Sequence, residues 1–257
     1  MLKHATNHTQ TRWQQAEKKM TIEKIFESYK DINLGQNEIC KKCIESNNST
    51  FFSKPISTWK VGKEYKTEPN KILFVGKVHR GENLGPMINN LFQDATKIGN
   101  SLLKHNSWAY WSYTREIIKA VHGNIENGKE KIAFTNLIKC NNSKTTDETK
   151  EFTKKSCLSD LKVVWNEIEI LKPNKVIFYT NTDYDNYIQN YKPSEHFEDL
   201  DNKHKKVKIG AKYMPWWNRV FYDEKGKVIM EFLRIGHPER LKKAEFINKV
   251  SNWAKKA

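Results

Sequence analysis

The sequence predicts an α/β fold of three layers, in which a central, mostly parallel four-stranded sheet lies between helices. Three observations support this prediction. Four short apolar runs are spread along the chain, amphipathic segments separate them, and glycine, proline or charged turn residues bound them. Strands that alternate with helices pair in parallel, and helices then cover both faces of the sheet.

The four apolar runs mark the expected strands, which are Lys71–Gly76, Ile132–Ile138, Lys175–Tyr179 and Val228–Ile235. Each run is short and rich in Val, Ile and Phe, as buried parallel strands are. A Lys172-Pro173 stop signal precedes the third run, and the turn Asp223–Gly226 leads into the fourth.

Helical patterns occupy the segments between the strands and both ends of the chain. They cover Thr21–Tyr29, Met87–Leu103, Tyr110–His122, Ser159–Leu171 and Ala244–Ala254. At 257 residues the chain is long enough for one domain with a substantial core. We therefore expect an N-terminal extension at residues 1–30 and a single α/β domain at 31–257, with an aromatic insertion at about 181–225.

The charge of the chain favours an anionic partner. Lys and Arg number 45 against 30 Asp and Glu, which gives a net charge of +15. Such an excess suits nucleic acid, although a basic chain can also be merely soluble. No apolar run is long enough to cross a bilayer and the N-terminus lacks the apolar core of a secretory signal, so we expect a cytoplasmic protein.

Polar and titratable residues follow the strands where each is expected to end. Ligands of parallel sheets bind outside the carboxyl ends of the strands, so these residues form a candidate site. The residues are Lys77, His79, Arg80 and Glu82 after the first strand, Asn136, Lys139 and Cys140 at the end of the second, and His237, Arg240 and Leu241 after the fourth.

Four cysteines make a candidate metal site. They are Cys40, Cys43, Cys140 and Cys157, and the first two form a Cys-x-x-Cys pair that we expect in a loop. In a reducing cytoplasm such a set is better explained by metal or chemistry than by disulfides. Four thiolates suit a [4Fe–4S] cluster or a Cys₄ zinc site, and unliganded buried cysteines are the third alternative.

These segments, in this order, resemble the iron–sulfur branch of the uracil-DNA glycosylase superfamily, often called family 4. The resemblance runs from about Cys40 to Leu241. It comprises a first loop, Gly76–Arg80, in the place of Gly-Glu-Ala-Pro-Gly, the strand end Asn136–Cys140 matching Asn-x-x-Lys-Cys, Cys157 at the start of a helix, and His237–Leu241 in the place of His-Pro-Ser followed by Leu. It implies a glycosylase-like fold that binds DNA and carries a structural [4Fe–4S] cluster.

The resemblance also implies roles for individual residues. Asn136 would hydrogen-bond a flipped-out base, because a carboxamide offers both a donor and an acceptor. His237 would face the base carbonyl and stabilise the charge that develops as the glycosidic bond breaks. The alternatives are an asparagine that caps a turn and a surface histidine.

The first loop departs from the family, because Lys77 stands where the family has Glu and His79 where it has Pro. We therefore expect Glu82 or His79 to position water or to stabilise the sugar cation. Lys77 would act as a Schiff-base nucleophile or would bind phosphate.

We expect a DNA-binding face around this site. Arg80, Lys139 and Arg240 would hold phosphates, and Arg240 or Leu241 would wedge into the duplex. In the aromatic insertion, Trp216 and Trp217 lie beside cations and would stack on bases. The alternative for these aromatic residues is a small satellite core.

An altered first loop and an added aromatic segment indicate a pocket for a base bulkier than uracil. The sequence therefore predicts a monomeric DNA glycosylase that removes a modified pyrimidine, such as those of some phage genomes, as an antiviral defence enzyme. The alternatives are an ordinary uracil-DNA glycosylase of base-excision DNA repair and a catalytically inactive DNA-binding iron–sulfur protein.

Overall fold

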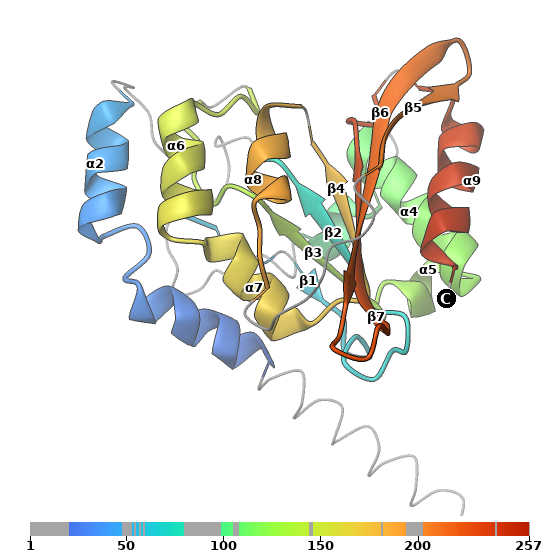
Figure 1. The fold of residues 1–257 in the computed structure, drawn as a ribbon, viewed down its shortest axis with the longest axis horizontal. Helices are drawn as coiled ribbons and strands as arrows, with labels where there is room; N and C mark the ends of the chain where they lie inside the picture. The colour runs from blue at the N-terminus through green and yellow to red at the C-terminus, as the bar shows by residue number, and fades with distance from the viewer. Residues whose placement is uncertain are drawn as a thin grey trace, which may run out of the picture.

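The computed structural model describes residues 21–47, 53, 55, 56, 58, 60–79, 99–104, 108–143, 146–180, 182–193, 203–239 and 241–256. Within these ranges a seven-stranded sheet separates two layers of helices (Figure 1). The predicted α/β class and its three layers are therefore confirmed. None of the described helices is both long and apolar enough to cross a bilayer.

The four predicted strands form the parallel centre of the sheet. They are β2 (Ile72–Gly76), β3 (Ile132–Asn136), β4 (Lys175–Tyr179) and β7 (Val228–Ile235). They pair in parallel in the order β3-β2-β4-β7. Every residue of β2, β3 and β4 is buried, as expected for strands covered on both faces.

The expectation of a four-stranded sheet is wrong, because three antiparallel strands extend the parallel centre. β1 (Lys60–Val61) pairs with β3 at one edge. At the other edge β6 (Lys212–Tyr222) pairs with β7, and β5 (Lys203–Ile209) pairs with β6. The aromatic insertion therefore contributes a hairpin to the sheet, and within β6 the residues from Trp216 to Tyr222 alternate between partly exposed and buried, as in a strand.

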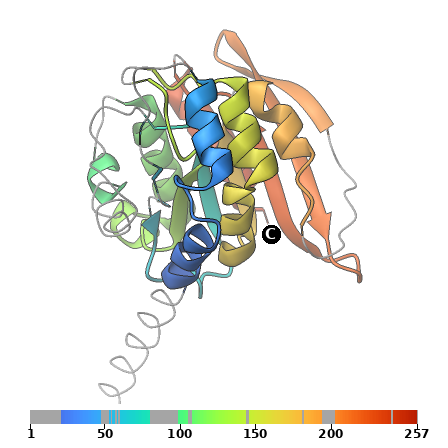
Figure 2. The same cartoon turned by 90° about the vertical axis from the view of Figure 1, so that its left-hand side faces the viewer.

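One helical layer contains residues 21–31, α2, α6, α7 and α8, and Figure 2 looks onto it. Its elements are α2 (Glu38–Ser46), α6 (Glu151–Lys155), a π-helical turn η2 (Ser156–Asp160), α7 (Val163–Leu171), a 3₁₀ turn η3 (Thr182–Tyr184) and α8 (Asp185–Gln189). The other layer contains α4 (Ala109–His122), α5 (Ile125–Gly128) and α9 (Lys243–Ala254). Of the predicted helix Met87–Leu103, residues 87–98 lie outside the described residues.

Two details of the first layer differ from the prediction. The Cys-x-x-Cys segment lies in α2 rather than in a loop, because the Asn37 side chain caps the helix by accepting from the Cys40 amide. The helix at residues 21–31 also belongs to the domain core, since Ile25 and Tyr29 are buried against the sheet. This helix therefore packs on the same core as the sheet.

A buried ion pair joins this layer to the sheet. Lys139 follows β3 and its ammonium lies 2.5 Å from the Glu167 carboxylate of α7, with both side chains fully buried. Burial lowers the pKa of Lys139, and the Glu167 carboxylate opposes that effect. Glu167 also accepts hydrogen bonds from the Tyr29 and Thr135 hydroxyls, so one carboxylate links a helix, a strand and a loop.

Replacing Glu167 by Gln is expected to destabilise the fold by about 3–5 kcal/mol, because Lys139 loses its buried counter-ion. Urea unfolding followed by circular dichroism measures this loss. The control is Glu38→Gln, which breaks an exposed pair with Lys41 and should leave the midpoint unchanged. Equal midpoints for the two variants would show that the buried pair contributes little.

Candidate functional site

The strand register brings the predicted strand-end residues together. Gly76 is the partner of Asn136, Tyr179 is the partner of Ile235, and Ile235 is the partner of Trp216. Since β2 lies between β3 and β4, these residues form one row across the carboxyl edge of the sheet. His237 follows two residues after Ile235 and lies at the same edge.

The Asn136 carboxamide lies directly over the end of β2. A Cβ atom at Gly76 would stand 2.4 Å from Asn136 Oδ1 and 3.5 Å from the Tyr110 hydroxyl. Glycine is therefore required at position 76, because any side chain would displace the carboxamide. The same distances show that Asn136 and Tyr110 approach one spot from β3 and α4.

Tyr110 connects this spot to His237. The two rings are nearly parallel, at 20°, with their centroids 6.5 Å apart, and the Tyr179 ring meets Tyr110 edge-on at 5.0 Å. Burial, together with Tyr179, holds the pKa of Tyr110 well above its ordinary range, so the phenol stays neutral. His237 Nδ1 accepts a hydrogen bond from the Glu239 amide at 3.3 Å, which in a neutral imidazole leaves the proton on Nε2.

An acidic residue that the sequence did not single out completes the site. Asp147, in the loop that follows β3, pairs with Lys77 at 2.7 Å and its side chain is 37% exposed. Burial opposes ionisation, but the hydrogen bond and charge of Lys77 and the charge of His237 hold the pKa of Asp147 below its ordinary value. Asp147 is therefore an anion near both residues. No motif marks it, and only its place in a polar loop after a strand could have suggested it.

Asn141 holds this loop in place. Its Nδ2 donates to the carbonyl oxygens of His79 at 2.6 Å and Thr146 at 2.8 Å. Its Oδ1 accepts from the Ser143 amide. Because one buried side chain ties the loop after β2 to the loop after β3, Asp147 is kept against Lys77.

The remaining residues predicted for catalysis differ in their position. Lys77 is held in an ion pair with Asp147, and this arrangement fits a positioning role better than a Schiff-base nucleophile. His79 is buried, and burial with the nearby Lys139 charge lowers its pKa to about 4, so it is a neutral residue beneath the site. Glu82 lies outside the described residues.

The residues predicted to bind DNA also differ in their exposure. Lys139 is paired in the core and Trp217 is 1% exposed, and neither position fits contact with a phosphate or a base. Packing, the alternative considered for the aromatic residues, accounts for Trp217. Trp216 and Leu241 are partly buried and pack against the core beneath α4 and α9. Arg80 and Arg240 lie outside the described residues.

The four cysteines converge from three segments. Cys40 and Cys43 lie in α2, Cys140 follows β3, and Cys157 lies in η2, a π-helical turn of a kind frequent at functional sites. All four are buried and none forms a disulfide. Burial raises the pKa of Cys40, Cys140 and Cys157, the last to about 12. Charges of the other cysteines raise these pKa values further, so the thiols are near neighbours.

The four cysteines and their surroundings fit a metal site only in part. Hydrogen bonds from the Gly35 amide to Cys40 Sγ, at 3.2 Å, and from the Lys139 amide to Cys157 favour the thiolates. The Lys139 charge also lowers the pKa of Cys140 and Cys157. However, within the described ranges no three His, Cys, Asp or Glu side chains are arranged so that they could hold a metal ion.

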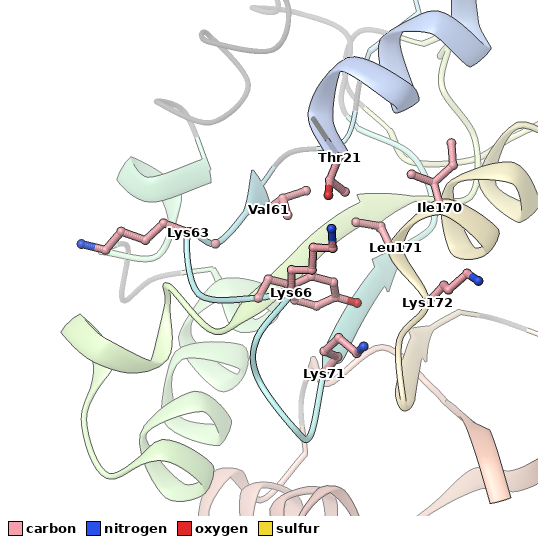
Figure 3. A pocket seen from close by; sticks show the side chains of 10 residues that line it. Thr21, Val61, Lys63, Lys66, Lys71, Ile170, Leu171 and Lys172 are labelled. Carbon is pink, nitrogen blue, oxygen red and sulfur yellow. The ribbon is translucent and has the colours of Figure 1, made fainter. Parts of the chain in front are cut away.

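Two hollows lie away from this edge. One has a volume of about 100 Å³ and lies where β2 and β4 begin, between Lys66, Lys71 and Lys172 (Figure 3). Burial, with the charges of Lys172 and Lys66, lowers the pKa of Lys71 there. The other is a groove of about 720 Å³ that includes Trp165 and Tyr187. Neither hollow is lined by Asn136, His237 or Asp147.

Comparison with known proteins does not place the chain in a family. No protein-family model matches it, and no curated protein has a significantly similar sequence.

The buried His79 predicts how stability depends on pH. Its pKa is about 4 in the folded chain and about 6.5 when exposed, so between these values the unfolded chain binds a proton that the folded chain does not. Stability from this group is complete above pH 6.5 and is lost as pH falls towards 4. Urea unfolding at pH 7 and 4.5 should show that wild type loses about 2 kcal/mol more than His79→Gln. Equal losses would refute the buried, neutral state of His79.

Proposed function

We propose that the chain is a DNA glycosylase that hydrolyses the N-glycosidic bond of a flipped-out, modified pyrimidine nucleotide and leaves an abasic site. The observation that carries the proposal is the group at the carboxyl edge of the sheet. There a buried carboxamide, a neutral phenol, a partly exposed imidazole and a carboxylate lie around one place. The resemblance at Asn136 and His237 supports the same assignment.

Recognition of the base falls to Asn136 and Tyr110. Gly76 leaves room for the carboxamide at the end of β2, where its oxygen and nitrogen would pair with the donor and acceptor on a pyrimidine edge. The Tyr110 ring offers a flat aromatic surface beside it. A base held in this way would first leave the helical stack, at a cost of a few kcal/mol.

Bond cleavage requires stabilisation of two opposite charges. The electron pair of the C1′–N bond passes to the base, and a hydrogen bond from His237 Nε2 to the base carbonyl would stabilise that anion. The sugar becomes an oxocarbenium-like cation, which the Asp147 carboxylate would stabilise. Water then adds to C1′, and its proton goes to Asp147 or to the departing base.

Asp147 thus takes the role that the sequence assigned to Glu82 or His79. It is ionised, it is accessible to solvent, and Asn141 fixes its loop. The resembled family has Glu at the position of Lys77. Lys77 is nevertheless compatible with catalysis, because it positions the Asp147 carboxylate, which comes from another loop.

We also propose that Cys40, Cys43, Cys140 and Cys157 hold a [4Fe–4S] cluster with a structural role. A [4Fe–4S] cluster takes four cysteine thiolates as ligands, and this chain has four buried thiols close together. The nearby charge of Lys139 favours the thiolate form of Cys140. The proposal requires the sulfur atoms to move into coordinating positions when the metal binds, because no metal-holding group is formed within the described residues.

Strand scission after alkali treatment tests the glycosylase proposal on three DNAs that carry normal bases, uracil or glucosylated hydroxymethylcytosine. Wild type should cleave the third DNA alone. Asn136→Ala should reduce the single-turnover rate by about 10²–10³-fold, as loss of one preorganised donor does. Asp147→Asn should reduce it by about 10²–10⁴-fold.

The matched control is Asn190→Ala, which removes an exposed carboxamide at the end of α8 and should keep the wild-type rate. Cleavage of uracil DNA would instead indicate ordinary base-excision repair. Bound but uncleaved DNA in all three cases would indicate a scaffold without chemistry and would overturn the proposal.

Metal analysis tests the cluster. Protein purified without oxygen should contain about four iron atoms and about four sulfides per chain, and Cys157→Ser should lose them. Ser156→Ala, at the neighbouring buried position, should retain the iron. Zinc without sulfide would favour a Cys₄ zinc site, and metal-free protein with full activity would show that the thiols need no ligand.

A further inference from the structure

The β5–β6 hairpin projects beyond the carboxyl edge of the parallel strands. β7 ends at Ile235, whose partner on β6 is Trp216, whereas β5 and β6 continue to pair as far as Ile209 and Lys212. Four residue pairs thus lie past the end of β7, a projection of about 13 Å at 3.3 Å per residue. Figure 1 shows the hairpin extending past the rest of the sheet.

One face of this projection is fixed to the domain. Val207, Ile209 and Met214 pack into the core that α4 and α9 cover. The turn is tied to α9, since the Gly210 amide donates to the Glu245 carboxylate at 2.8 Å. Met214 also lies against Gly236, the residue before His237, where a Cβ would meet its Cγ at 3.3 Å. The hairpin is therefore an anchored element that begins beside the candidate site.

The opposite face is cationic and exposed. Lys206 and Lys208 point to this face from β5, and Tyr213, the partner of Lys208 on β6, is 66% exposed. Lys212 is exposed at the turn. An aromatic ring that remains in solvent between lysines gains nothing from core packing, and such a combination suits a sugar–phosphate chain with bases that can stack.

We propose that the exposed hairpin face, formed by Lys206, Lys208 and Tyr213, together with Lys212 at the adjoining turn, is a wing that holds DNA beside the catalytic site. This inference rests on the proposed function. The three lysines contact phosphates, which gives affinity without sequence preference. Tyr213 stacks on a base next to the flipped nucleotide and keeps the strand open. The wing replaces Trp217 as the aromatic contact of the insertion.

Fluorescence anisotropy with a labelled DNA, measured at several salt concentrations, tests the wing. The variant Lys206→Ala/Lys208→Ala/Lys212→Ala should bind more weakly, and its log–log salt slope should be smaller than that of wild type by about 3. Tyr213→Ala should weaken binding to single-stranded DNA by about tenfold at an unchanged salt slope.

The control is Lys63→Ala/Lys66→Ala/Lys172→Ala, which removes three exposed lysines at the opposite edge of the sheet. Because both triple variants lose the same charge, only local contacts distinguish them. The control should keep the salt slope of wild type. All these side chains are exposed, and unchanged thermal melting would verify that every variant folds.

Two outcomes separate this inference from the proposed function. If wild type binds DNA and the two triple variants have equal slopes, the wing is refuted while the glycosylase proposal stands. If wild type does not bind DNA, the glycosylase proposal itself fails. Tighter binding to anionic lipid vesicles than to DNA, lost in the hairpin variant, would overturn the choice of partner.

Discussion

The ion pair between Lys139 and Glu167 is the interaction on which the rest of the described structure depends. Two opposite charges are buried completely where β3, α7 and the helix at residues 21–31 meet. A buried pair contributes less to stability than its short distance suggests, but the loss of one partner is costly. The pair therefore fixes how the helical layer packs on the sheet. It also fixes the course of the backbone after β3.

That path determines what the following residues can do. Lys139 lies between Asn136, whose carboxamide reaches the end of β2, and Cys140, whose thiol joins those of α2 and η2. The charge of Lys139 acts on the thiols, whose anions it favours, and on His79, whose protonation it opposes. Lys139 thus lies between two sites that are only a few residues apart along the chain: the polar site at Asn136 and the cysteine site at Cys140.

The polar site is assembled from loops more than from strands. Asn141 ties the loop after β2 to the loop after β3, and this tie brings the Asp147 carboxylate to Lys77. α4 supplies the Tyr110 ring, and the segment after β7 supplies His237. The β5–β6 hairpin stands next to these residues through the contact of Met214 with Gly236. Each part comes from a different stretch of sequence, and the carboxyl edge of the sheet is what they share.

The sequence by itself determined the four parallel strands, because a short apolar run between turn residues leaves a buried strand few alternatives. It also determined that Asn136 and His237 lie at one edge, since parallel strands end on the same side. Only the tertiary structure decided that Lys139 and Trp217 are buried, that Asp147 reaches Lys77, and that Tyr213 is the exposed aromatic residue of the hairpin. The physical reason is that burial and ion pairing depend on neighbours distant in sequence, whereas apolar periodicity and strand polarity are local properties of the chain.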